Sequence, residues 1–135
     1  MPSSISFPEP VAVAAVTDGG ATETVIATSG GVLCDQQIRQ VTVWGMIELT
    51  TNATACTAVV VKVRRGTTAA GTQVGTTQTI SATTSSSYSI PFMVTEPRTP
   101  GGPYVYSVTV AETGATNHTG TVDTAVIAAV GSSAP

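Results

Sequence analysis

Histidine is the residue type that most often transfers protons near neutral pH, and the sequence contains one, His118. It lies in a glycine-rich segment, residues 114–120, and could form a catalytic triad with Asp123 and one of the many serines. A common form of such a triad presents its nucleophile on a strained Gly-x-Ser-x-Gly turn, and that pattern does not occur in the sequence. We therefore interpret His118 as a solvated loop residue.

Carboxylates are the next candidates for chemistry. A glycosidase needs two that converge, and a calcium loop needs acidic or amide residues at alternating positions. The sequence instead distributes its eight carboxylates along the whole chain: Glu9, Asp18, Glu23, Asp35, Glu48, Glu96, Glu112 and Asp123. We expect no catalytic residue, no metal site, no cofactor and therefore no enzyme.

Two cysteines, Cys34 and Cys56, are too few to form a zinc site with a single histidine. The first ten residues carry no basic side chain, so we see no secretion signal and expect synthesis in a host cytoplasm. In that setting the cysteines are interpreted as reduced, buried apolar residues, and a disulfide between them is the alternative.

The charge pattern excludes two classes of partner. Five basic residues and a net charge of −3 argue against binding to nucleic acid, and no apolar stretch is long enough to span a membrane. Lys62, Arg64 and Arg65 form the one basic cluster, which we interpret as the charged end of a strand, with a polyanion site as the alternative. Charged residues make up only 10% of the chain, which favours a protein surrounded by neighbouring subunits.

The composition and the residue pattern predict β-strands. Threonine, a β-branched residue, occurs 25 times, and short apolar runs alternate with turn-rich breaks without helical spacing. The clearest strand is predicted over 40–50. Its inward residues are Val41, Val43, Ile47 and Leu49, and its outward residues include Trp44 and Met46.

A bulge at Gly45 would reverse this alternation, but it would also turn Glu48 inward, so we expect an unbroken strand. Trp44 and Met46 are then candidates for a surface that binds another protein. The alternative is that the N-terminal segment or a loop of the same chain covers them.

Further strands are expected over 58–64, 72–81, 88–94, 104–110 and 121–130. The second strand should follow the first through a hairpin at 51–54, and Pro91 should place its strand at a sheet edge or a bulge. In the last strand the expected inward residues are Val122, Val126, Ala128 and Val130. About eight strands at this spacing predict a two-sheet antiparallel sandwich, either a jelly roll, which we favour, or an immunoglobulin-like fold.

Residues 1–10 are expected to form an extended arm that precedes a single sandwich domain over 11–135. Three prolines disfavour regular structure there, while Ile5 and Phe7 are large apolar side chains. The arm is either a frayed terminus or a tether that lays Ile5 and Phe7 on a neighbouring subunit.

A family resemblance adds to this interpretation. The segments 61–68, 71–75, 103–110 and 121–130 resemble small jelly-roll structural proteins of tailed bacteriophages, which are similar to the tumour-necrosis-factor/C1q type of sandwich. The resemblance covers roughly residues 40 to 130 and carries no functional residue with it. It implies a virion subunit, commonly a homotrimer that decorates a capsid.

The combined expectation is a non-enzymatic virion protein, a capsid decoration (cement) subunit on the outer capsid surface. Its partners would be further copies of itself and a major capsid or other virion protein. The alternative is a carbohydrate-binding or adhesion module, including a tail or fibre component. That alternative needs exposed aromatic side chains, and three of the four candidates, Tyr88, Tyr104 and Tyr106 but not Trp44, are predicted to point inward.

Overall fold

The computed structural model describes residues 4–6, 11–18, 23–51, 56–114 and 118–133, and the side chains of 23–51, 56–114 and 121–133. These residues form strands β1 (Ser4–Ser6), β2 (Val11–Asp18), β3 (Thr24–Thr28), β4 (Val32–Cys34), β5 (Ile38–Thr50), β6 (Cys56–Arg65), β7 (Gln73–Ser81), β8 (Ser87–Pro97), β9 (Gly101–Tyr104), β10 (Tyr106–Gly114) and β11 (His118–Ser133).

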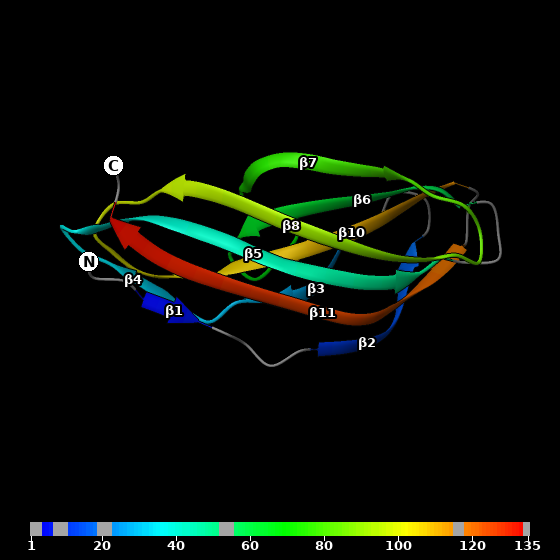
Figure 1. Ribbon diagram of the computed structural model, residues 1–135, viewed down its shortest axis with the longest axis horizontal. Helices are drawn as coiled ribbons and strands as arrows, with labels where there is room; N and C mark the ends of the chain where they lie inside the picture. Colours follow the sequence, from blue (N-terminus) through cyan, green and yellow to red (C-terminus); the bar gives the residue numbers. More distant parts are fainter. Residues whose placement is uncertain (1–3, 7–10, 19–22, 52–55, 115–117, 134–135) are drawn as a thin grey trace.

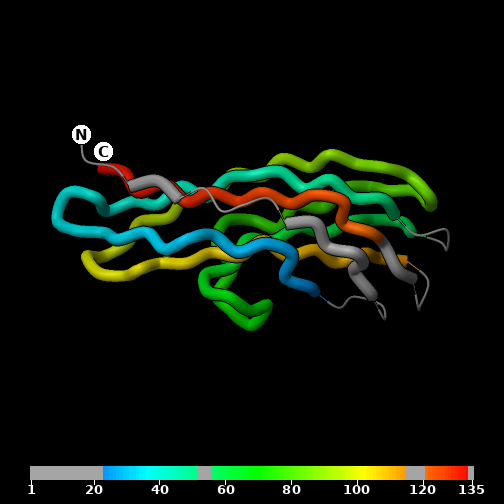
Figure 2. Tube along the Cα trace, turned by 90° about the horizontal axis from the view of Figure 1, so that it is seen from below, coloured from blue at the N-terminus to red at the C-terminus, as the bar shows by residue number. Residues whose placement is uncertain are grey.

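Two antiparallel sheets pack face to face (Figure 1). The first sheet has the order β1-β11-β5-β8, and β2 pairs with β11 on the same edge as β1. The second has the order β3-β10-β6-β7, and β4 pairs with β9 in a short separate ribbon. The molecule is elongated along its strands, as the Cα trace shows (Figure 2).

The strand pairing follows a nested rule. β6 pairs with β7, β5 with β8, β4 with β9, β3 with β10 and β2 with β11, all antiparallel. The chain is therefore one long hairpin whose closed end is β6–β7, and rolling it up brings β10 beside β6 and β11 beside β5. This is the topology of a jelly roll, which decides between the two sandwich types that the sequence allowed.

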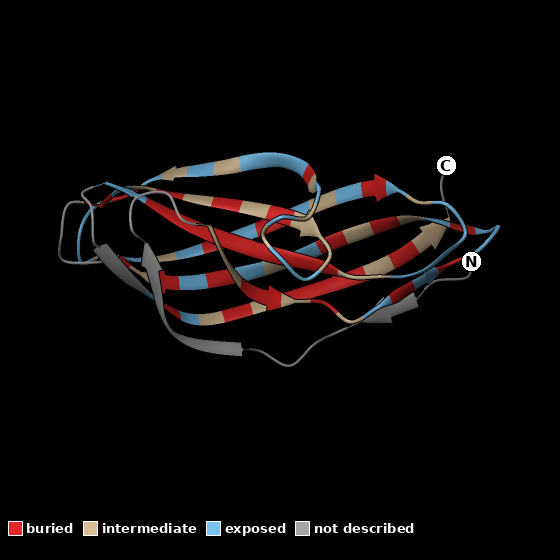
Figure 3. Cartoon of the chain, turned by 180° about the vertical axis from the view of Figure 1, so that it is seen from behind, coloured by how far each residue is buried: buried red, intermediate tan, exposed pale blue. Residues whose placement is uncertain are grey.

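Alternation along the strands fills the core between the sheets (Figure 3). In β5 the four residues predicted to point inward, Val41, Val43, Ile47 and Leu49, are all at most 2% exposed. The pairing of β5 with β8 runs without a register shift, so the predicted unbroken strand is confirmed. Cys34 and Cys56 are buried in this core without a bridge between them.

The central glycine of β5 allows its neighbours to come close. A Cβ atom at Gly45 would lie 1.9 Å from the carbonyl oxygen of Val126 in β11 and 2.7 Å from the ring of Phe92 in β8. The Phe92 ring therefore occupies the space that a side chain at position 45 would need. Pro91 lies in β8, at the edge of this sheet, which confirms the position predicted for that strand.

The predicted hairpin between β5 and β6 is wrong. β5 belongs to the five-stranded sheet and β6 to the four-stranded sheet, so the two strands do not pair; residues 52–54 of the predicted turn lie outside the described residues. A polar turn between two apolar strands indicates a reversal of the chain, both in a hairpin within one sheet and in a connection between two sheets. The local sequence does not specify whether the next strand pairs with the previous one or faces it across the core.

The inward row predicted for the last strand is also wrong after Val122. The core residues of β11 are Val122, Ala125, Ile127 and Ala129, while Val126, Ala128 and Val130 occupy outward positions. The pairing with β5 explains the change, because Val122 lies opposite Leu49 and Thr124 opposite Glu48, which leaves Asp123 as an extra residue. A β-bulge of this kind reverses the alternation of every residue that follows it.

Candidate interaction face on the five-stranded sheet

The bulge at Asp123 and the unbroken alternation of β5 together place apolar side chains on the outer face of the five-stranded sheet. Trp44 of β5 lies opposite Met93 of β8 and Ala128 of β11. Met46, two residues along β5, lies opposite Pro91 and Val126. We call this group, together with Val130, the apolar face; its members are Trp44, Met46, Pro91, Met93, Val126, Ala128 and Val130.

The apolar face is open to solvent at its centre. Met93 is 72% exposed, Met46 43% and Trp44 39%, whereas Ala128 beside them is fully buried. Tryptophan and methionine are enriched in the buried centres of protein–protein interfaces, and contiguous exposed apolar patches mark interaction sites. The prediction that Trp44 and Met46 point away from the core is confirmed, and their role in binding another protein stays a prediction.

Hydroxyl groups border the apolar face along the strands. At one end Thr42 and Thr95 share a hydrogen bond of 3.0 Å. At the other end Thr50 pairs with Ser87 at 3.2 Å and donates a hydrogen bond of 3.1 Å to Asp123. An apolar centre with a polar rim is the usual composition of an interface.

Sequence reasoning missed Met93, Val126 and Val130. The outward position of Met93 follows from strand alternation. Its neighbours Phe92 and Val94 are buried and half-buried, so the residue between them must point to the opposite face. Val126 and Val130 were assigned to the core because the bulge was not recognised. Its signal is the polar pair Asp123-Thr124 inside an apolar strand, where plain alternation would place one of the two in the core.

The two arm residues proposed as interface candidates are only partly placed. The backbone of Ile5 pairs with Val130 in β11 of its own chain, and the side chain of Ile5 and all of Phe7 lie outside the described residues. The backbone of β1 thus lies at the edge of the sheet whose outer surface contains the apolar face.

The predicted basic cluster is taken up in ion pairs. Arg64 binds Glu23 with both its Nε and Nη2 atoms, the latter at 2.8 Å, and Thr109 donates a hydrogen bond of 2.7 Å to the same carboxylate. Lys62 lies 3.6 Å from Glu23. The hydrogen bonds from Arg64, which outweigh the effect of burial, lower the pKa of Glu23 to about 2. These contacts favour the interpretation of Lys62 and Arg64 as charged strand residues and argue against the alternative, a polyanion site.

A second carboxylate links the two sheets. Glu96 of β8 accepts a 2.6 Å hydrogen bond from the buried hydroxyl of Tyr106 in β10 and another of 2.6 Å from Arg65 of β6. Arg98 lies 3.6 Å from Glu96 and its guanidinium stacks on the Tyr104 ring. Burial raises the pKa of Glu96, but the hydrogen bonds from Arg65 and Tyr106 outweigh it and hold that pKa below its usual value.

The described residues contain no group of three His, Cys, Asp or Glu side chains positioned to hold a metal ion. His118 is the first residue of β11 rather than a loop residue, and its backbone pairs with Asp18 in β2. No helix within the described ranges has the length and hydropathy needed to span a membrane.

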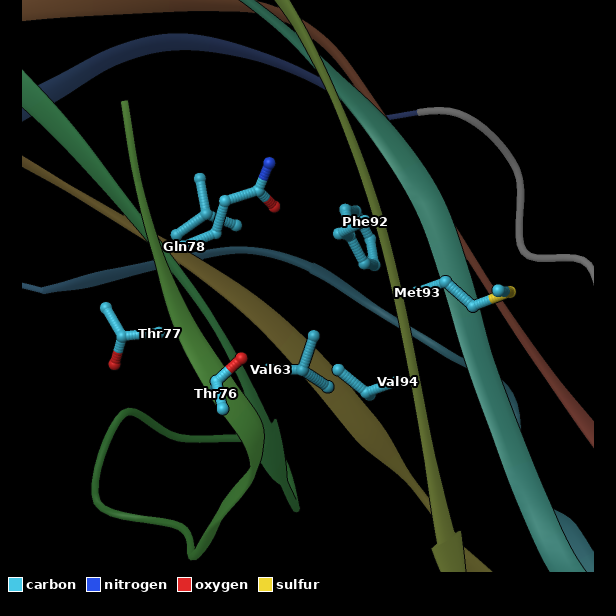
Figure 4. A pocket seen from close by; sticks show the side chains of 8 residues that line it. Val63, Thr76, Thr77, Gln78, Phe92, Met93 and Val94 are labelled. Atoms are coloured by element: carbon cyan, nitrogen blue, oxygen red, sulfur yellow. The ribbon is translucent and has the colours of Figure 1, made fainter. Parts of the chain in front are cut away.

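A groove of about 220 Å³ opens between the edge strands β7 and β8 (Figure 4). A bulge in β7 creates it, because only one residue of β6, Lys62, separates the partners of Val74 and Gln78. Phe92 and Val94 point toward the groove, and Met93 points to the opposite side of β8 (Figure 4). The described lining carries hydroxyl, amide and apolar groups without an ionisable side chain, so the groove offers no evident catalytic chemistry.

Comparison with known proteins relates this fold to virus structures. No family profile matches the sequence, and no curated protein matches it. The chain is similar to a structure of infectious bursal disease virus strain Gx, with a TM-score of 0.59 and 11% identity over 96% of this chain and 32% of that chain. It is also similar to a structure of strain Gt, with a TM-score of 0.56 and 9% identity over 99% of this chain and 38% of that one.

A mutant VP2 protein of the same virus, in derived T=1 particles, gives a TM-score of 0.56 at 10% identity, covering 97% of this chain and 36% of that chain. This chain therefore spans about a third of the length of the viral chains it resembles. At these identities the similarity establishes a shared fold and not a shared function.

Proposed function

We propose that this chain is a non-enzymatic structural subunit of a virion. The observation that carries the proposal is a jelly roll over almost the whole chain whose outer sheet surface exposes Trp44, Met46 and Met93. The shared fold with structures of a virus and of virus-derived particles supports it. A jelly roll also occurs in lectins and cupins, so the fold alone does not decide the function.

The more specific form of the proposal is a capsid decoration subunit on the outer surface of a tailed bacteriophage, assembled as a homotrimer. The resemblance of segments 61–68, 71–75, 103–110 and 121–130 to such proteins is its support. Residues 1–10 would contact the capsid or a neighbouring subunit. The carbohydrate-binding alternative is less well supported, because Tyr106 is fully buried and Tyr88 and Tyr104 are half-buried.

Gradient centrifugation of a lysate from the native source tests the proposal, with the chain followed by mass spectrometry. We expect the chain to sediment with particles that protect nucleic acid from nuclease. A chain that stays with small proteins at the top of the gradient would contradict the proposal.

The role of the arm is tested in the same gradient. A variant that lacks residues 1–10 loses only the three-residue strand β1 from the described fold, so its melting temperature should change little. If the arm is a tether, this variant should stay at the top of the gradient. Sedimentation of the truncated chain with the particles would remove the arm from the proposal.

A further inference from the structure

The outer surfaces of the two sheets differ in charge, and this difference indicates where another protein binds. The outer surface of the four-stranded sheet carries Glu23 with Lys62 and Arg64, a self-contained ion cluster. On the described strands β5, β8 and β11, the charged residues at outward positions are Glu48 and Asp123. Both are acidic and both lie at the same end of the sheet.

This arrangement suits a second copy of the chain better than a charged partner. A chain with a net charge of −3 repels its copies unless they meet through an uncharged surface, and the apolar face is such a surface. Two copies related by a two-fold axis would place the same face on itself, which is the geometry of most homodimers.

The acidic end decides between the two possible two-fold arrangements. If the strands of the two copies ran in the same direction, Glu48 and Asp123 of both copies would be brought together, which like-charge repulsion disfavours. If the strands run in opposite directions, Glu48 of one copy lies near the uncharged Gln40 of the other, and the acidic ends of the two copies are kept apart. Trp44 is the middle residue of β5 and would lie on the axis.

The edges of the two sheets offer a poorer contact. β8, at one edge of the five-stranded sheet, contains Pro91, which has no N–H group to pair with another strand, and β7, at one edge of the four-stranded sheet, is bulged away from its neighbour. β11 is covered by β1 and β2. These features oppose edge-to-edge pairing of copies, whereas a face-to-face contact leaves them untouched.

The size of the contact is sufficient for a reversible dimer. With about 3.3 Å per residue and about 4.8 Å between strands, the surface of β8, β5 and β11 measures roughly 40 by 14 Å. Burying it on both copies would remove about 1,100 Å² from solvent, which exceeds the roughly 1,000 Å² expected of a biological interface and is typical of a weak, reversible contact.

We propose that two copies of this chain pack their apolar faces together around a two-fold axis at Trp44, with their strands antiparallel. This inference rests on the proposed self-assembly of a structural subunit and specifies the contact. It is compatible with three-fold contacts elsewhere on the subunit, because assemblies such as D3 hexamers combine both kinds of axis.

Engineered cysteines test the arrangement directly, since Cys34 and Cys56 are buried and only an added thiol is accessible. Gln40→Cys is mixed with a tagged Glu48→Cys chain and mildly oxidised. We expect disulfide-linked heterodimers from the mixture and little self-linking of either variant alone. Efficient self-linking of Glu48→Cys, or no linking in any combination, would overturn the proposal.

Sedimentation velocity over a range of concentrations measures the same contact in another way. Met93→Asp should weaken self-association at least tenfold, while Thr79→Asp, a matched change on the exposed surface of β7, should leave it unchanged. Equal behaviour of the two variants would count against the proposal. If the chain sediments with particles but no heterodimer forms, this inference fails and the virion role stands; the reverse result would leave the dimer and remove the virion role.

Discussion

Replacing Glu23 with glutamine should make the free energy of unfolding less dependent on pH in the acidic range. Glu23 is mostly buried on the outer surface of the four-stranded sheet, where Arg64, Thr109 and Lys62 contact its carboxylate. These contacts favour the charged form, so the pKa is about 2 in the folded chain compared with an ordinary value of 4.5. Glutamine keeps the shape and one oxygen acceptor but removes the charge.

The pKa shift sets the size of the effect. Each pKa unit corresponds to about 1.36 kcal/mol, so the shift from 4.5 to about 2 is equivalent to about 3 kcal/mol. Solvent screens part of this energy because Lys62 is 28% exposed, and we expect about 2 kcal/mol at neutral pH. Because the folded pKa is lowered, this stability is present above pH 4.5 and is lost progressively as the pH falls toward 2.

Urea unfolding at pH 7 and pH 3 measures the difference between wild type and Glu23→Gln. We expect wild type to be about 2 kcal/mol more stable at pH 7, and more than half of that advantage to disappear at pH 3. Glu48→Gln, at an exposed carboxylate of β5, is the control for the loss of one negative charge. An advantage of the same size at both pH values would show that the carboxylate is not stabilised through its charge.

Two further predictions concern the inter-sheet contact and the bulge. Tyr106→Phe removes the hydroxyl that donates a buried hydrogen bond to Glu96, and chemical unfolding should show a loss of about 2 kcal/mol, against less than about 1 kcal/mol for Tyr104→Phe at an exposed hydroxyl. Equal losses for the two variants would mean that the buried hydrogen bond from Tyr106 to Glu96 stabilises the fold no more than the exposed one made by Tyr104. Deletion of Asp123 should destabilise the fold by at least about 3 kcal/mol because it turns core residues such as Ile127 outward, whereas Asp123→Ala keeps the bulge and should cost less than about 1 kcal/mol. Similar melting temperatures for the deletion and the substitution would refute the assigned register.

Local alternation predicts those parts of this fold in which each strand keeps one phase. β5 is such a strand, and both its buried valines and its outward Trp44 follow from a period of two residues. β11 is the counterexample, because a single additional residue at Asp123 changes the face on which Val126 and Val130 lie. The bulge in β11 is stabilised by pairing with β5, which lies about seventy residues earlier in the sequence. Residues close to Asp123 in the sequence therefore do not determine it.

Dependence on distant strands also explains why the β5–β6 hairpin was wrongly predicted and why most of the apolar face was missed. The connection between β5 and β6 looks like a hairpin in sequence, but pairing of β5 with β8 and β11 leaves no edge of β5 free for β6. Of the seven residues of the apolar face, the sequence therefore predicted the two on β5, Trp44 and Met46, as candidates for binding another protein. The remaining part depends on which strands flank β5, and that follows from the nested pairing of the entire chain.

The nested pairing also affects synthesis of the protein. β2 must wait for β11, which leaves the ribosome about 100 residues later, and at 5–20 residues per second this delay is about 5–20 s. Until then β5 has only β8 as a neighbour in its sheet, and apolar residues that later face β11 are open to other chains. Folding of the complete sandwich is therefore expected only after β11 has been synthesised, and nascent chains on neighbouring ribosomes could exchange this strand before each sandwich closes on itself.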